Sequence, residues 1–154
     1  MLLAAGCVQT SEHTASSGIT IDQSLTYGRG LDSRIAEARK AIHENPSDPA
    51  PHYLLAKAYL MRKDLDSAEA EFAAIIELSP DSAGAYYELA RIRASRGHDT
   101  EALKLLSRAI ELKQEFPEAH HALARVHDRL GNAEKARIHH ELYLELLENR
   151  AALK

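Results

Sequence analysis

The sequence is poor in cysteine and has no long apolar run. Cys7 is the only cysteine among 154 residues, and one thiol cannot build a structural zinc site of several cysteines. No apolar run approaches the roughly 20 residues that a membrane-spanning helix requires, and 27% of the residues are charged. The composition therefore predicts no transmembrane helix and is typical of a single helical domain.

Basic clusters and catalytic signatures are also missing. The 19 basic and 23 acidic residues give a formal charge of −4, and no basic strip with interleaved aromatics appears, which argues against nucleic acid as a partner. The chain contains no P-loop, no G-x-S-x-G or G-x-G-x-x-G turn and no H-E-x-x-H helix. We therefore predict neither an enzyme nor a bound cofactor.

What the sequence does contain is an internal repeat of 34 residues. Leu-Asp-Ser occurs at residues 31–33 and again at 65–67, and Leu-Ala pairs begin at Leu55, Leu89 and Leu123. A unit of this size cannot bury its apolar face alone, so successive copies must stack on their neighbours. The period predicts an all-α solenoid of antiparallel helix pairs, with full copies at residues 49–82, 83–116 and 117–150.

Turn and capping residues fall where such helix pairs need them. Asp48 and Asp81 precede predicted helices, and Asp66 with Glu69 is a candidate capping pair. Glycine stands in the turn between paired helices in the second and third copies, at Gly97 and Gly131. Lys63 takes that place in the first copy, so we expect a less sharply defined turn there.

The repeat resembles the tetratricopeptide repeat. That family's pattern, W-x2-L-G-x2-Y, then A-x3-F, then P, falls in the first full copy on His52, Leu55, Ala56, Tyr59, Ala68, Phe72 and Pro80. The likeness extends from Leu31 to Arg150. It implies a protein-binding adaptor or scaffold in which the first helix of each copy lines a concave groove that holds a protein or an extended peptide.

Residues 25–48 are predicted to form a partial repeat ahead of the first full copy. Its second helix runs from Leu31 to Asn45, and Pro46 closes it. Its expected partner helix is poor, because residues 16–30 hold three glycines and several Ser/Thr. We interpret residues 8–24 as a flexible tether and residues 151–154 as a C-terminal tail.

The N-terminal residues resemble the end of a bacterial lipoprotein signal. Small residues, Ala4-Ala5-Gly6, precede Cys7, and the resemblance implies that residues 1–7 are a signal remnant with Cys7 as the site of palmitate-type lipidation. A basic n-region and most of an apolar h-region are missing. Val8 suits outer-membrane sorting, which implies a lipid anchor at the periplasmic face. The alternative is an unmodified cysteine in a cytoplasmic protein.

Groove residues follow from the family's groove positions. The nine that we assign to peptide binding are Tyr53, Lys57, Leu60, Met61, Tyr87, Arg91, His121, Arg125 and Arg129. Lys57, Arg91 and Arg125 form a basic ladder at the repeat interval, next to an aromatic one. Carboxylates of a partner can meet the cations while its apolar side chains pack on the rings. The alternative is that these cations only solvate the helices and pair with acids such as Glu88.

Nine histidines raise the possibility of a metal site. His120, His127 and His140 occupy family positions that normally hold core aromatics, so we expect them to approach one another. Adjacent histidines on a helix point about 100° apart and cannot chelate as a doublet. We predict core or rim histidines, no bound metal, and a histidine-dependent metal enzyme only as a distant alternative.

The last predicted helix carries an apolar strip for which no capping helix follows. Tyr143, Leu144 and Leu147 lie on it, and we predict a face for a second copy or another partner. Bending back of the helix to bury these residues is the alternative. The favoured function is an outer-membrane lipoprotein adaptor that assists an envelope assembly such as the type IV pilus; the alternative is a cytoplasmic adaptor or co-chaperone.

Overall fold

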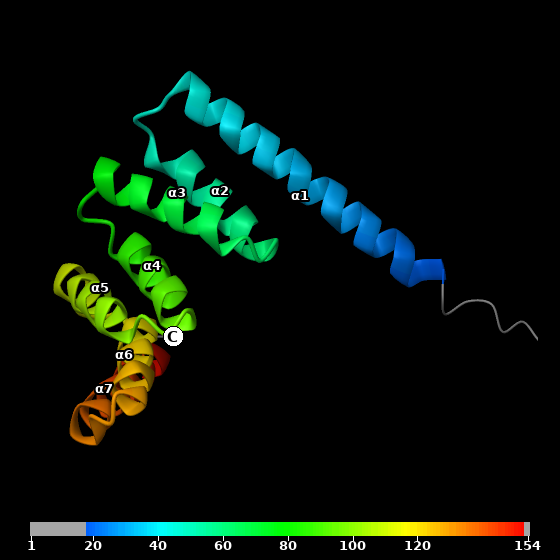
Figure 1. Cartoon of the computed structure of the whole chain (residues 1–154). Coiled ribbons are helices and arrows are strands. Elements are labelled where there is room, and N and C mark those ends of the chain that lie inside the picture. The colour runs from blue at the N-terminus through cyan, green and yellow to red at the C-terminus, as the bar shows by residue number, and fades with distance from the viewer. Residues whose placement is uncertain (1–17, 153–154) are drawn as a thin grey trace, which may run out of the picture. The chain divides into compact units, whose positions relative to one another are not determined.

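The computed structural model describes residues 18–152, and their side chains from residue 30 onward. The described residues form helices and no strands, which confirms the all-α prediction (Figure 1). The helices are α1 (Gly18–Glu44), α2 (Pro49–Met61), α3 (Leu65–Leu78), α4 (Ala83–Ser95), α5 (Asp99–Leu112), α6 (Pro117–Arg129) and α7 (Ala133–Ala152). The chain divides into two units between Ser33 and Arg34, and the full repeats lie in the second.

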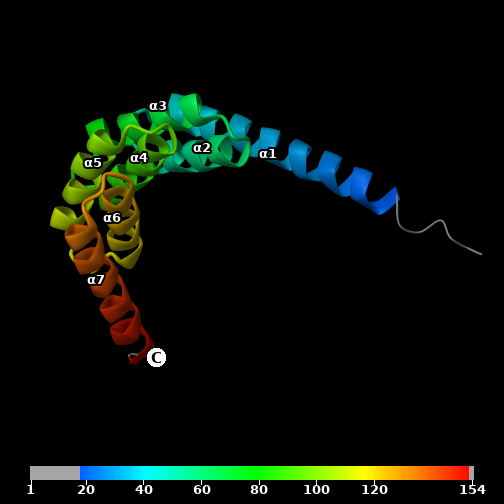
Figure 2. The ribbon, with the colours of Figure 1, turned by 60° about the horizontal axis from the view of Figure 1, so that its bottom comes forward.

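Each full repeat is one helix pair, and each pair packs on the next. Helices α2 and α3, α4 and α5, and α6 and α7 are the pairs, while α3 contacts α4 and α5 contacts α6. Figure 2 shows these helices following a curved path, with α2, α4 and α6 on its inner side. The arrangement confirms the predicted solenoid and places the first helices where a groove can form.

Leucine and alanine at the repeat interval build the core. Leu55, Leu89 and Leu123 are buried, and a buried leucine contributes about 1.5–3 kcal/mol relative to an exposed one. The alanines Ala68, Ala102 and Ala136 in the second helices are also buried. Their small side chains let paired helices approach closely, as the sequence predicts.

Helix starts confirm one predicted cap and correct two. The carboxylate of Asp48 accepts a hydrogen bond from the Ala50 N–H at 2.9 Å. Asp64, not Asp66, caps α3 and accepts from the Ser67 N–H at 3.1 Å. Asp66 is already inside the first turn because the helix begins at Leu65. At α4 the capping residue is Ser82, and the Asp81 carboxylate accepts from the Ser79 hydroxyl instead.

The turns between paired helices share one geometry in all three repeats. Gly97 and Gly131 have φ of 80° and 74°, and Lys63 has φ of 61°. The expectation of a less defined turn at Lys63 was wrong. Its backbone is fixed by main-chain hydrogen bonds, among them Asp64 N–H to the Tyr59 carbonyl at 3.0 Å. A non-glycine residue in this region costs about 1–2 kcal/mol.

Helix α1 is longer than the sequence analysis proposed. It runs without interruption from Gly18 to Glu44, so residues 18–24 of the predicted tether are helical and residues 8–17 lie outside the described residues. The three glycines at 18, 28 and 30 do not break it, because a glycine in a helix costs only about 1 kcal/mol. The predicted partial repeat, residues 25–48, therefore consists of part of this one helix and the turn that follows it.

None of the helices between residues 18 and 152 is both long enough and apolar enough to cross a bilayer. Cys7 lies outside the described residues, as do residues 153 and 154 of the predicted C-terminal tail. Residues 151 and 152 of that tail belong instead to the last turn of α7.

Candidate functional site

The predicted groove residues come from the inner helices, and all of them except Leu60 line one or more of three hollows. The aromatic hollow, of about 610 Å³, is lined by Tyr53, Tyr87 and Phe116 together with charged residues and the end of α7. The basic hollow, of about 260 Å³, is lined by Tyr87, Arg91, His121, Arg125 and Arg129, among others. The third, of about 560 Å³, lies between α1 and α2. Tyr87 and Glu118 border both of the first two hollows, which are therefore adjacent.

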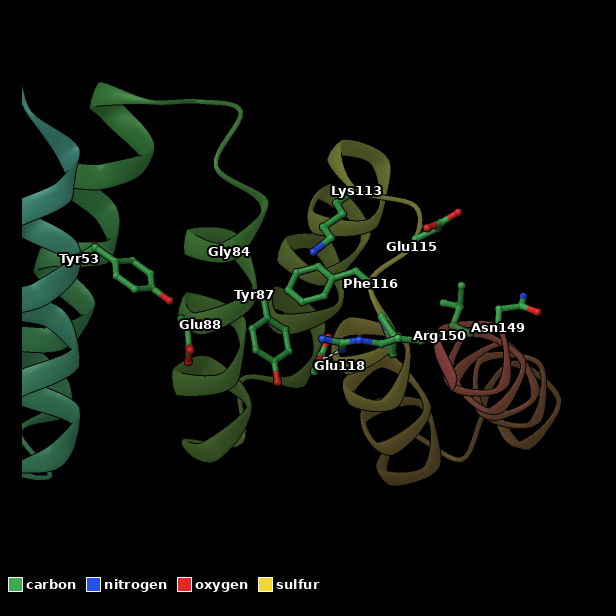
Figure 3. Close-up of a pocket in the computed structure, with 12 residues that line it drawn as sticks. Tyr53, Gly84, Tyr87, Glu88, Lys113, Glu115, Phe116, Glu118, Asn149 and Arg150 are labelled. Atoms are coloured by element: carbon green, nitrogen blue, oxygen red, sulfur yellow. Dashed lines mark ion pairs between the residues drawn. The ribbon is translucent and has the colours of Figure 1, made fainter. Parts of the chain in front are cut away.

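The aromatic hollow is built from rings that the stacking of repeats brings together. Figure 3 shows Tyr87 of α4 beside Phe116, which immediately precedes α6. Tyr53 of α2 lies on the side of Tyr87 that is away from Phe116. The Tyr87 and Phe116 ring centroids are 5.0 Å apart, and Lys113 Nζ lies 4.9 Å from the Phe116 centroid. Burial raises the pKa of Tyr87. Such a surface suits an apolar or aromatic side chain of a partner.

Helix α7 closes one side of the aromatic hollow. Leu146, Asn149 and Arg150 line it from the last turns of that helix. The Arg150 guanidinium points into the hollow and lies 3.7 Å from a Glu118 carboxylate oxygen, as Figure 3 shows. Both side chains are exposed, so this ion pair stabilises α7 only slightly.

Glu88 forms ion pairs with two of the three cations in the predicted ladder. Its side chain is buried, with 6% of the residue exposed, and it forms ion pairs with Lys57 of the preceding repeat and with Arg91, whose Nη1 is 2.9 Å away. Burial alone lowers the pKa of Lys57, but the hydrogen bonds and charges of Glu88 and, to a smaller extent, Tyr53 together outweigh it, and the pKa is raised. A buried carboxylate is costly without partners, so the two cations stabilise it here.

Arg125 is therefore the ladder's unengaged cation. Within the part of the chain that the structure describes it makes no ion pair, and it is exposed. Arg129, by contrast, holds Asp99 with its Nε 3.1 Å from the carboxylate. That hydrogen bond lowers the pKa of Asp99 and raises the pKa of Arg129. Arg129 thus joins α6 to the start of α5, while Arg125 remains available to a ligand.

Of the remaining predicted groove residues, two lie outside the aromatic and basic hollows and one borders the basic hollow. Met61 lines the third hollow with Lys57 and the exposed Leu54. Leu60 is half-buried and does not line any of the three hollows. His121 borders the basic hollow, and its ring centroid is 4.8 Å from that of Tyr143 on α7.

Several residues of the site were not assigned to it from the sequence. Phe116, Lys113 and Arg150 belong to a loop and to the end of α7, where the family's groove positions do not point. Glu88 had a detectable signal, because the repeat interval aligns it with Leu54 and Ala122, and a carboxylate at an otherwise apolar position needs a cation nearby.

The clustered histidines lie between α6 and α7 and include one that was not expected. His139, not His140, approaches His120, with 3.1 Å between their Nδ1 atoms. His140 is exposed and lies near Tyr143 instead. The His127 and His139 rings stack with an interplanar angle of 2°. Stacked rings do not aim their nitrogen lone pairs at one point, and residues 18–152 contain no group of three side chains suited to hold a metal ion.

The predicted C-terminal face is only partly exposed. Leu144 and Leu147 are 45% and 37% exposed, and Ile138 on the same helix is 43% exposed. Tyr143 is half-buried because its ring packs on His121. The exposed part of the strip thus consists of separate aliphatic side chains, Ile138, Leu144 and Leu147, and does not include the Tyr143 ring.

This combination of stacked helix pairs and a curved inner face defines a repeat solenoid that binds other proteins. A family model described as tetratricopeptide repeat matches residues 35–92 and residues 62–126. The chain belongs to the tetratricopeptide repeat family. It is a protein–protein interaction adaptor or scaffold, and the family points to an interaction module rather than an enzyme.

Solved structures show the same fold. The chain is similar to two crystal structures of MamA, at 23% and 22% identity, with TM-scores of 0.71 and 0.70 over 77% and 79% of this chain and 69% and 67% of theirs. It is also similar to residues 41 to the end of MamA from Desulfovibrio magneticus RS-1, at 19% identity, with a TM-score of 0.70 over 81% of this chain and 71% of the other. Comparison with curated proteins gives no match.

Proposed function

We propose that the aromatic and basic hollows together bind an extended, acidic segment of a protein partner. The observation that carries this is that Arg125, a cation without an ion pair among the described residues, lines a hollow adjacent to the one formed by Tyr87 and Phe116. A carboxylate of the partner reaches Arg125, and an adjacent apolar side chain enters the aromatic hollow. Pairing a carboxylate with a cation next to an aromatic surface gives both affinity and direction to an extended chain.

Glu88 sets the charge that this surface offers. Without Glu88, the cations Lys57, Arg91 and Arg125 would repel one another and bind any anion. With Glu88 paired to Lys57 and Arg91, the positive charge that remains for a ligand lies at Arg125 and at the exposed part of Arg91. Arg91 keeps a 55% exposed side chain while it pairs with Glu88. A partner carboxylate placed between the two arginines therefore gains from both without displacing the buried pair.

Selection of random twelve-residue peptides displayed on phage tests this proposal with the full chain as bait. Enriched peptides should carry Asp or Glu close to an aromatic residue. Arg125→Glu should weaken them about tenfold or more, since it places like charge against the carboxylate, and raising the salt concentration should weaken the wild type. Lys104→Glu is the control, because it makes the same change of charge at an exposed position of α5. Equal loss in both variants, or in neither, would move the binding surface elsewhere.

We further propose that the chain is lipid-anchored at the periplasmic face of an outer membrane. What supports this is the run of small residues before Cys7 and the polar Ser/Thr-rich stretch after it. In the native gene, Cys7→Ser should abolish palmitate labelling and release the protein from membranes. Absence of labelling in the wild type would favour the alternative, a cytoplasmic adaptor or co-chaperone.

The anchored form is proposed to assist an envelope assembly such as the type IV pilus. The support is the combination of an adaptor fold with a lipoprotein-like start. Capture of partners from a solubilised envelope fraction, with Arg125→Glu as the matched bait, tests it. Pilus or other envelope components should be retained by the wild type and lost from the variant, and recovery of cytoplasmic chaperones alone would contradict the proposal.

The exposed strip of α7 is proposed as a second contact surface, for another copy of this chain. Leu144 and Leu147 support it by their exposure. Sedimentation of the wild type and of a Leu144→Glu, Leu147→Glu variant decides: the wild type should be the heavier species, and two monomers of equal mass would refute self-association.

A further inference from the structure

The repeat interval places one pair of side chains at the same point of every helix pair, and its chemistry changes along the chain. The first position lies in the first helix and the second lies in the second helix. The three pairs are His52 with Glu71, Tyr86 with Leu105, and His120 with His139. The first repeat thus holds a histidine against a carboxylate, and the third holds a histidine against another histidine.

The third pair belongs to a cluster of three largely buried rings that joins α6 to α7. His120 and His127 are each 7% exposed, and His139 is half-buried between them. The Nδ1 atoms of His120 and His139 are 3.1 Å apart, and the His127 and His139 ring centroids are 5.7 Å apart. The cluster therefore takes the place of core aromatics at the contact between the two helices.

The hydrogen bonds of the cluster fit neutral rings. His120 Nε2 lies 3.4 Å from the Gln114 carbonyl oxygen, which can only accept, so this nitrogen carries the proton. In a neutral ring His120 Nδ1 is then an acceptor and His139 Nδ1 donates to it. If one ring takes up a proton, a cation is buried without an anion beside it. If both do, two N–H groups face each other and the bond is lost.

No carboxylate compensates for such a charge. Among the described residues none pairs with the three rings: on α7, Glu134 and Glu141 are held by Arg137, and on α5, Asp99 is held by Arg129. The titratable side chains His121 and Asp128 of α6 line a separate hollow together with His140 of α7.

Lys135 is the charged neighbour of the cluster. Burial, and then the positive charge of Lys135, lowers the pKa of His127. Burial, the other two histidines and Lys135 lower that of His139. Because folding lowers these pKa values below 6.5, the stabilisation is complete above pH 6.5 and is lost as the pH falls toward the folded-state values.

We propose that the histidine cluster makes the third repeat a pH-sensitive element, in which mild acid loosens α7 from α6. Among the described residues the third repeat packs on one neighbouring repeat, through α5 and α6, and a repeat held from one side opens more readily than one held from both. Leu146, Asn149 and Arg150 of α7 line the aromatic hollow, so this opening removes one wall of that hollow. The pH response itself does not depend on the peptide binding proposed above.

Hydrogen exchange of the full chain, corrected for the intrinsic effect of pH, tests the proposal. For each proton taken up on opening, the opening constant of α6 and α7 amides should rise about tenfold per pH unit once the pH is below about 6.5. Amides of α2 and α3 should not follow, because His52 Nδ1 lies 2.7 Å from a Glu71 carboxylate oxygen, which compensates for a proton there. Unchanged protection of α7 at pH 5.5, or equal loss in α3, would overturn the proposal.

Substitutions taken from the middle repeat give the matched variants. His139→Leu installs the residue found at Leu105 and should remove most of the acid response of α7. The double variant His120→Tyr, His139→Leu installs the whole middle pair and keeps the test decisive if the single variant folds poorly. His98→Gln, at an exposed position, is the control and should behave as the wild type. A full acid response in the folded double variant would refute the role of the cluster.

Discussion

The first and third full repeats share their backbone arrangement and buried leucines, and they differ in the side chains that meet between their paired helices. Leu55 and Leu123, at equivalent positions, are 2% and 1% exposed, and the turns that follow have the same left-handed backbone. Yet His52 faces Glu71 at 2.7 Å, whereas His120 faces His139 at 3.1 Å. The period therefore determines where side chains meet, while each pair's identity decides how that repeat responds to its environment.

The largest expected effect tests the shared frame. Leu55→Ala and Leu123→Ala should each lower the free energy of unfolding by about 2–5 kcal/mol, through lost burial and a residual cavity. Lys104→Ala, on an exposed face, should stay within about 0.5 kcal/mol. Urea titration measures all three. A cost for Leu123→Ala as small as that for Lys104→Ala would contradict the packing of α6 described above.

Converting the first repeat's pair into the third repeat's pair should have the next largest effect. Glu71→His removes a charge-assisted hydrogen bond between half-buried side chains, at a cost of about 1–3 kcal/mol near pH 6. It should also make α2 and α3 acid-sensitive, because a buried imidazolium then lacks its anion. Glu77→His is the control on an exposed part of the same helix. An equal loss of stability in the two variants would show that the His52–Glu71 contact is dispensable.

The wild type's pH dependence should reveal the third repeat's pair. Unfolding free energy should fall as the pH drops from 7.5 to 5.5, by at most about 1.4 kcal/mol per pH unit for each proton bound. The hydrogen bonds that lower the pKa values of Asp64 and Asp99 contribute in a separate window, below their ordinary value of 3.8. Denaturant titrations across pH check this, and a flat profile between pH 7.5 and 5.5 would contradict it.

Most of the fold could be predicted because the period is a property of the chain itself. Leu89 and Ala102 recur at fixed intervals, and burial of both follows from the stacking that such a period requires. Helix starts were harder to predict. Asp64 and Asp66 are both good caps. The choice depends on where the preceding turn ends, which main-chain hydrogen bonds such as that from the Asp64 N–H to the Tyr59 carbonyl decide.

The candidate site could be predicted only in part. Tyr53 and Tyr87 reach the predicted surface because their positions repeat with the frame. Phe116 and Arg150 do not repeat, and they reach the aromatic hollow through the stacking of one particular loop and helix. The engagement of Arg91 by Glu88 was foreseen as an alternative, but its burial and its sharing with Lys57 are consequences of three-dimensional packing.

The smallest expected effect concerns the turns, where the first repeat differs from the other two by one residue. Lys63 holds a φ of 61° that glycine adopts without a side-chain penalty. Relief of about 1–2 kcal/mol of backbone cost is offset by the greater freedom of glycine in the unfolded chain, about 0.5–1 kcal/mol. Lys63→Gly should therefore stabilise the protein by about 0.5–1 kcal/mol.

The reverse change in the third repeat completes that comparison. A Cβ at Gly131 meets nothing within 4 Å, so Gly131→Lys changes the backbone cost alone and should destabilise by a similar amount. Lys104→Gly, inside α5, is the control and should lose about 1 kcal/mol of helix propensity. Thermal or urea unfolding of Lys63→Gly, Gly131→Lys and Lys104→Gly gives the order of their stabilities. Destabilisation by Lys63→Gly would mean that the lysine side chain contributes more to this turn than its exposed position indicates.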